Sequence, residues 1–121
     1  MVLLKNDGAT YSYNGHFLYL EKPSVLKNNT AYLPAQFYKQ LGAEVVVNEN
    51  SATLTYNGVS YTYIADSKIF FENDKPGSIT YATFKENDTI YIAPTDLQKV
   101  FDITVGTSYL KNAKQITIRF N

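Results

Sequence analysis

The stretch from Asn28 to Tyr56 reads NNTAYLPAQFYKQLGAEVVVNENSATLTY, and its pattern predicts a strand, a short helix and a hairpin. Pro34 suits the first turn of a helix, and Phe37 and Leu41, four residues apart, give that helix one apolar face. Gly42 follows as a typical helix end. A helix this short is held by packing rather than by its own propensity.

Hairpins are predicted on both sides of this helix. The apolar run Ala43–Val47 and the alternating run Ala52–Tyr56 flank a polar turn, which indicates a hairpin. Asn14-Gly15 and Asn57-Gly58 each lie between alternating aromatic segments, the strongest short-range hairpin signal. With eleven Tyr and seven Phe in 121 residues, the chain favours sheet over helix.

The same pattern occurs a second time. Residues 87–101 read NDTIYIAPTDLQKVF and residues 115–120 read QITIRF, so that turn, strand, helix-opening proline and final strand return in order. We therefore predict two repeats, about 11–55 and 70–118, joined by a hairpin at 56–69 within one domain, 1–121.

The predicted fold class is α+β, a twisted antiparallel sheet of hairpins with two short helices, Pro34–Leu41 and Pro94–Phe101, related by pseudo-two-fold symmetry. Each helix is too short to bury its own face, so both should pack on a shared sheet. The predicted core consists of apolar side chains on the inner faces: Phe37, Leu41, Val45, Leu54, Leu97, Phe101, Ile116 and Ile118.

Composition excludes several classes of protein. Eleven basic and eleven acidic side chains cancel, so there is no broad positive field to attract nucleic acid. The absence of cysteine removes disulfides, thiolate metal sites and thiol nucleophiles. The segment from Met1 to Gly8 has only three consecutive apolar residues after Met1, which is too few for the core of a signal peptide or for a membrane span. Two origins stay open: a cytoplasmic protein, or a segment of an exported one.

No catalytic residue, cofactor or metal site is predicted. His16 is the one histidine, follows a turn, and has no partner for a nucleophilic triad. The carboxylates Asp66, Glu72, Asp74, Glu86 and Asp88 match no calcium loop in their spacing. Turn chemistry explains Asp74 and Asp88. The sequons at Asn28 and Asn87 are interpreted as turns for the same reason.

The tyrosines are the candidate ligand-binding residues. Alternation places Tyr11 and Tyr13 on one face of a strand, and Tyr61 and Tyr63 on one face of another. If the helices cover these faces, the rings are core. If the faces are open, the rings form a platform on which sugars could stack or a protein could dock.

The chain resembles the copper amine oxidase N-terminal-like, or "stalk", domain family. The resemblance lies in Thr30-Ala31-Tyr32-Leu33-Pro34, in Gln40-Leu41-Gly42-Ala43-Glu44-Val45 and in Ala52-Thr53-Leu54-Thr55, and it covers almost the whole chain. The family's usual Arg after the helix-opening Pro is absent, and Asp102 replaces the second helix-ending Gly. One histidine cannot build a copper site of the oxidase kind, so copper is not implied.

The resemblance implies a non-catalytic structural or binding module of a cell-surface or cell-wall protein of Gram-positive bacteria. Its expected location is extracellular or in the wall, and its expected partner is a wall glycan or another surface protein. One alternative is a small intracellular or phage-encoded oligomer that sequesters a ligand or partner. Another is a fibre subunit in which the edge strand Val2-Leu3-Leu4 completes a neighbour's sheet, so self-association stays open.

Overall fold

The fold is mostly antiparallel β-structure with short helical segments. The computed structural model describes residues 2–5, 10–13, 16–19, 25–27, 30–110 and 113–120, with the side chains of Val25, Lys27, 30–106 and 117–120. The strands are β1 (Val2–Lys5), β2 (Thr10–Tyr13), β3 (His16–Tyr19), β4 (Val25–Lys27), β5 (Thr30–Pro34), β6 (Glu44–Val47), β7 (Ser51–Tyr56), β8 (Val59–Ile64), β9 (Ser67–Glu72), β10 (Lys75–Glu86), β11 (Thr89–Ile92), β12 (Ile103–Leu110) and β13 (Ala113–Phe120). The helical segments are η1 (Ala35–Leu41), η2 (Pro94–Leu97) and α1 (Gln98–Phe101).

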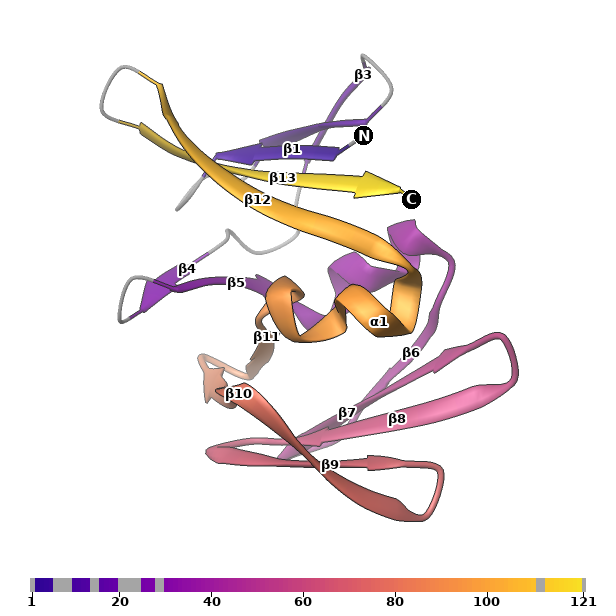
Figure 1. Cartoon of the computed structure of the whole chain (residues 1–121). Coiled ribbons are helices and arrows are strands. Elements are labelled where there is room, and N and C mark those ends of the chain that lie inside the picture. Colours follow the sequence, from indigo (N-terminus) through magenta and orange to yellow (C-terminus); the bar gives the residue numbers. More distant parts are fainter. Residues whose placement is uncertain are drawn as a thin grey trace.

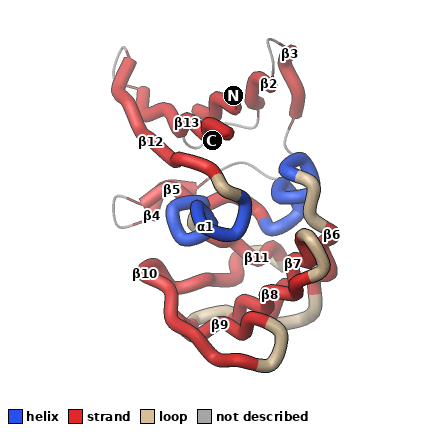
Figure 2. Tube along the Cα trace, turned by 45° about the vertical axis from the view of Figure 1, so that its right-hand side comes forward, coloured by secondary structure: helices blue, strands red, loops and turns tan. Residues whose placement is uncertain are grey.

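The described strands form two sheets. One has the order β12-β13-β1-β2-β3, and the other has the order β4-β5-β11-β10-β9-β8-β7-β6 and curves as a half-barrel. The helical segments lie between the two sheets, as Figures 1 and 2 show from two directions. The predicted α+β class is therefore only partly right, because the fold is mostly β-structure. The prediction of one shared sheet under both helices is wrong, since the helices lie between two sheets.

Strand β1 is not an edge. It pairs with β13 on one side, with Val2 opposite Ile118, and with β2 on the other, with Val2 opposite Tyr13. The hypothesis that this strand completes a neighbour's sheet is wrong in this respect, because the backbone groups it needed are already used within the chain.

Both helices lie close to the predicted positions. The first is a 3-10 helix that begins at Ala35, because Pro34 keeps an extended backbone (ψ 142°) as the last residue of β5. It ends at Gly42 (φ 101°), where the Gly42 N–H donates to the Lys39 carbonyl at 3.1 Å. The second spans Pro94–Phe101, as predicted, with a 3-10 first turn. Asp102 ends it in the same left-handed region (φ 52°), so it takes the backbone role of the missing glycine.

The predicted hairpin turns are confirmed where the structure describes them. Asn57 and Gly58 have positive φ (51° and 80°), and so do Asn87 and Asp88 (50° and 63°). Residues 14–15 and 28–29 lie outside the described residues, but the strands that flank them pair as expected. Tyr13 lies opposite His16, and Lys27 lies opposite Thr30.

One core cluster contains side chains from both predicted halves. Of the predicted core, six side chains are buried: Phe37, Leu41, Leu54, Leu97, Phe101 and Ile118. Val45 is only half-buried against this cluster, and the side chain of Ile116 lies outside the described part. Each fully buried aliphatic or aromatic side chain stabilises the fold by roughly 1.5–3 kcal/mol.

Tyr38 is a core residue that the periodicity did not predict. It is fully buried, stacks on Phe101 with ring centroids 5.9 Å apart, and donates its hydroxyl to the Ile92 carbonyl at 2.8 Å. This bond joins η1 to β11, so the first helix is fixed to a strand of the second predicted half. No helix among the described residues is long and apolar enough to cross a membrane.

Candidate functional site

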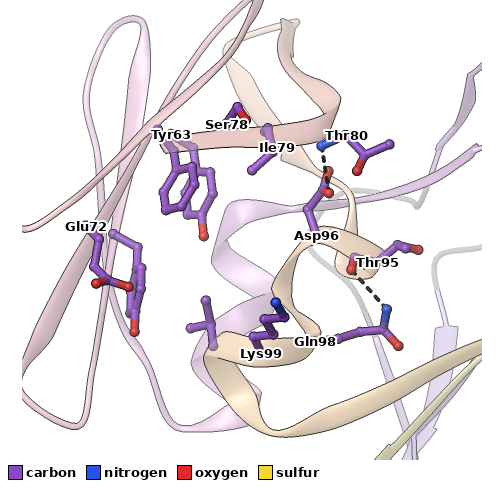
Figure 3. A pocket seen from close by; sticks show the side chains of 12 residues that line it. Tyr63, Glu72, Ser78, Ile79, Thr80, Thr95, Asp96, Gln98 and Lys99 are labelled. Atoms are coloured by element: carbon purple, nitrogen blue, oxygen red, sulfur yellow. Dashed lines mark hydrogen bonds between the residues drawn. The ribbon is translucent and has the colours of Figure 1, made fainter. Parts of the chain in front are cut away.

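A groove of about 490 Å³ lies between strands β8–β10 and the segment η2–α1. Aromatic side chains form one wall, and polar side chains of β10, η2 and α1 form the other, as Figure 3 shows from close by. Its lining consists of Tyr61, Tyr63, Phe70, Glu72, Ser78, Ile79, Thr80, Thr95, Asp96, Gln98, Lys99 and Val100. The volume suits a small ligand.

The aromatic wall is ordered by ring stacking. Tyr63 and Phe70, opposite each other on β8 and β9, stack with centroids 5.5 Å apart and planes 11° apart. The Phe70 ring also lies over Gly77 of β10, where an added Cβ would be 2.7 Å from Phe70 Cε1. Gly77 therefore leaves the space that the Phe70 ring occupies, because any side chain at position 77 would displace that ring.

Asp96 shapes the opposite wall. Between Ser78 and Thr83 the register of β10 against β9 shifts, so the intervening residues bulge out of the ladder. The Asp96 carboxylate accepts a hydrogen bond from the Thr80 N–H at 2.9 Å and another from the Tyr81 N–H at 2.9 Å. Asp96 thus replaces the lost ladder partners of the bulge, and both of its oxygens are engaged.

Gln98 and Lys99 complete this side from α1. The Gln98 amide donates to the Thr95 carbonyl at 3.1 Å, and its oxygen accepts from the Val105 N–H at 2.9 Å, which fixes the side chain. Lys99 is exposed and extends from α1 into the groove in Figure 3. Among the described residues no carboxylate forms an ion pair with it.

The groove phenols stay protonated well above neutral pH. Burial raises the pKa of Tyr63, with smaller contributions from Tyr61, Asp96 and Glu72. Burial, and then the Glu72 carboxylate opposite it on β9, raise the pKa of Tyr61. Both hydroxyls therefore remain hydrogen-bond donors, and neither is a candidate base.

This arrangement favours binding over chemistry. Asp96 is held by two backbone N–H groups, and Glu72 is exposed, so the described lining of the groove has no free, enclosed carboxylate pair of the kind that acid–base catalysis uses. Among the described residues, no three side chains of the histidine, cysteine or carboxylate types gather to hold a metal ion.

The predicted tyrosine platform is divided by the fold. Tyr61 and Tyr63 do share one face and line the groove together, but Tyr63 is only 1% exposed and so belongs to the core as well. Tyr11 and Tyr13 lie on β2, in the other sheet, and their side chains are outside the described part, as is that of His16. Whether these tyrosines bind a ligand stays a prediction.

Of the groove lining, only Tyr61 and Tyr63 were predicted from the sequence; Phe70, Asp96 and Lys99 were missed, and so was Gly77, which makes room for Phe70. Gly77, inside a strand pattern, is the one signal that could have indicated a close approach of another group to the backbone. Asp96 gave no such signal, because a carboxylate in the first turn of a helix is ordinary.

A second hollow of about 390 Å³ lies beside β4, β9 and β10. Lys27 and Lys68, both exposed, lie at this hollow, and the Lys27 ammonium is 4.1 Å from the centroid of the Phe84 ring. The cation–π contact with Phe84 is sufficient reason for Lys27 to lie at this hollow, so Lys27 does not point to a ligand there. The first groove is therefore the better candidate site.

The chain folds as a mostly β-structured module with a groove between its second sheet and the segment η2–α1. Residues 12–118 match the family model described as "Copper amine oxidase N-terminal domain", and the chain belongs to this family. No curated protein and no solved structure matches the chain. Such a domain is a non-catalytic module. The residues do not fit a copper site, since the chain has a single histidine.

Proposed function

We propose that the chain serves as a binding module of an exported cell-surface or cell-wall protein, and that its groove holds a carbohydrate of the wall. Family membership supports a non-catalytic role. The extracellular or wall location and the glycan partner are part of this proposal.

The groove's two unlike walls are the observation that carries the proposal. A sugar ring has an apolar face and a rim of hydroxyls, so it fits a site with aromatic rings on one side and hydrogen-bonding groups on the other. Tyr61 and Phe70, both partly exposed, supply the aromatic side. Thr80 and Thr95, both exposed, and the ammonium of Lys99 supply the other.

We also infer that the two predicted halves are related by a pseudo-two-fold axis. Two runs of five neighbouring strands support this: β12-β13-β1-β2-β3 in one sheet and β6-β7-β8-β9-β10 in the other. In the first run, the hairpin β12–β13, which follows the second helix, lies beside β1, β2 and β3, which precede the first helix. In the second run, the hairpin β6–β7, which follows the first helix, lies beside β8, β9 and β10, which precede the second helix. The antiparallel pairing of β5 with β11, with Leu33 opposite Ile92, suits an axis between these two strands.

The test is sedimentation of the purified protein with purified peptidoglycan and wall polysaccharides. Gly77→Ala should displace the Phe70 ring and weaken binding about tenfold, which corresponds to about 1.4 kcal/mol. Because the clash is with the end of a side chain, the fold should tolerate the change. Gly106→Ala is the matched control, since an added Cβ there has no heavy atom within 4 Å.

Tyr61→Ala should weaken binding as well, because it removes a partly exposed ring of the groove. Binding that is unchanged in both Gly77→Ala and Tyr61→Ala would show that the groove is not the site. No binding by the unaltered protein to any wall fraction would refute the proposed function itself.

A further inference from the structure

We propose that the groove selects sugars that carry a free, positively charged amine over their neutral, N-acetylated counterparts. This inference rests on the proposed function and names the chemistry of its ligand. It comes from the two carboxylates of the groove, Glu72 and Asp96, which the general fit to a sugar does not use.

The groove is negative although the chain is neutral. Two carboxylates, Glu72 and Asp96, and one ammonium, Lys99, line it, which leaves one net negative charge. The tyrosines add none, because the raised pKa values of Tyr61 and Tyr63 keep both phenols neutral at physiological pH. The whole chain has equal numbers of acidic and basic residues, so the groove is more negative than the chain as a whole.

The two carboxylates differ in what they can still bind. Asp96 already accepts two backbone hydrogen bonds at 2.9 Å each. Glu72 is exposed and makes no ion pair with a described residue, although Lys75 lies opposite it across the β9–β10 hairpin. Glu72 is therefore the carboxylate that is available to an incoming cation.

An aromatic ring stands beside this carboxylate. Tyr61 of β8 lies directly opposite Glu72 of β9, on the same face, and its raised pKa registers the nearby charge. A carboxylate next to a tyrosine ring attracts an organic ammonium group through both the charge and the ring. Figure 3 places Glu72 across the groove from Asp96 and Gln98.

Lys99 fits the same ligand at a different point. Its ammonium has three donors and no acceptor, so it can bond to the hydroxyl or ring oxygens of a sugar. Lys99 would repel an amine, which restricts the amine to the Glu72 side of the groove. The result is one preferred orientation for an amino sugar that stacks on the aromatic wall.

The experiment compares two oligosaccharides of equal length by calorimetry: a glucosamine oligomer with free amines and the corresponding N-acetylglucosamine oligomer. The unaltered protein should bind the free-amine oligomer more tightly, and the difference should shrink as salt is added. Glu72→Gln should weaken binding of the free-amine oligomer about fivefold. It should leave the N-acetylated oligomer unaffected.

Glu86→Gln is the matched control. Glu86 is also an exposed carboxylate near a tyrosine, since it contributes to the raised pKa of Tyr91, but it does not line the groove. An equal loss of affinity in Glu72→Gln and Glu86→Gln would overturn the inference, because the effect would then be one of overall charge. Thermal melts of both variants should match that of the unaltered protein.

The outcomes separate this inference from the proposed function. Equal binding of the two oligosaccharides, or binding of neither while wall binding still depends on Gly77, would overturn the amine preference and leave the groove as a wall-binding site. Wall binding that is indifferent to Gly77→Ala and Tyr61→Ala would overturn both.

Discussion

Replacing Tyr38 with Phe tests the link between the two halves of the chain. The Tyr38 side chain is fully buried, and its hydroxyl donates to the Ile92 carbonyl at 2.8 Å across 54 residues of sequence. The substitution removes one oxygen atom and leaves the ring against Phe101. Any loss of stability therefore reports on that hydrogen bond.

The expected loss follows from the burial of both partners. A neutral intramolecular hydrogen bond contributes a net stabilisation of about 0.5–1.5 kcal/mol, and the carbonyl that remains would lose a bonding partner away from water. We expect Tyr38→Phe to lower the free energy of unfolding by about 1 kcal/mol and the melting temperature by about 4 °C. Tyr38→Ala, which also leaves a cavity beside Phe101, should cost about 3–5 kcal/mol.

Equilibrium unfolding in urea measures these changes. Tyr56→Phe is the control, because the Tyr56 ring also packs on Phe101, with centroids 4.8 Å apart, while its hydroxyl bonds to no residue within the described part of the chain. Tyr38→Phe should be clearly less stable than Tyr56→Phe. If the two variants had the same free energy of unfolding, the bond to Ile92 would not stabilise the fold and our reasoning would be wrong.

Three further predictions concern alkaline pH, the bulge and the turns. Burial raises the pKa of Tyr38 and Tyr63 above the ordinary value of 10.0, so the folded state keeps protons that the unfolded state loses. The associated stability should be complete below pH 10 and should fall as the pH rises further, by up to about 1.4 kcal/mol per pH unit for each tyrosine. Urea midpoints from pH 8 to 11 would show this, and each Tyr→Phe change should flatten the slope. Asp96→Asn should cost about 1–3 kcal/mol in the same assay, because an amide can accept from only one side and presents a donor to the other N–H. Gly58→Ala should cost about 1 kcal/mol for its positive φ alone. Gly42→Ala should cost more, since its Cβ would also lie 3.3 Å from a tyrosine ring; equal costs would argue against that contact.

The elements that were predictable from the sequence are those set by neighbouring residues. Asn57-Gly58 is a turn because both residues tolerate positive φ, and the second helix opens at Pro94 because a proline lacks only an N–H that the first turn leaves unbonded. Asp102 shows that such a rule concerns backbone conformation more than residue type. It adopts the left-handed conformation that Gly42 adopts at the end of the first helix.

The groove could be predicted only in part, because its walls depend on contacts between distant residues. Tyr61 and Tyr63 followed from alternation along a single strand. The place of Phe70 depends on the absence of a side chain at Gly77, on the neighbouring strand. The place of Asp96 depends on a bulge 15 residues earlier in the chain, and no periodicity along the helix shows that the bulge needs an acceptor.

The composition of the sheets was the least predictable feature, and the reason is physical. The sequence of a turn specifies which two strands form a hairpin. The outer strand of that hairpin, however, presents unpaired N–H and C=O groups, and any other strand of suitable register can pair with them. Here β7 is followed along its sheet by β8 and β9, whereas the hairpin β12–β13 is followed by β1 and β2, from the opposite end of the chain. The position beside β13 borders the shared core, since Ile118, which lies opposite Val2 on β13, is fully buried in the same cluster as Leu33 and Leu54. Local patterns therefore specify the individual hairpins, while burial of one common core favours an arrangement in which distant hairpins lie together.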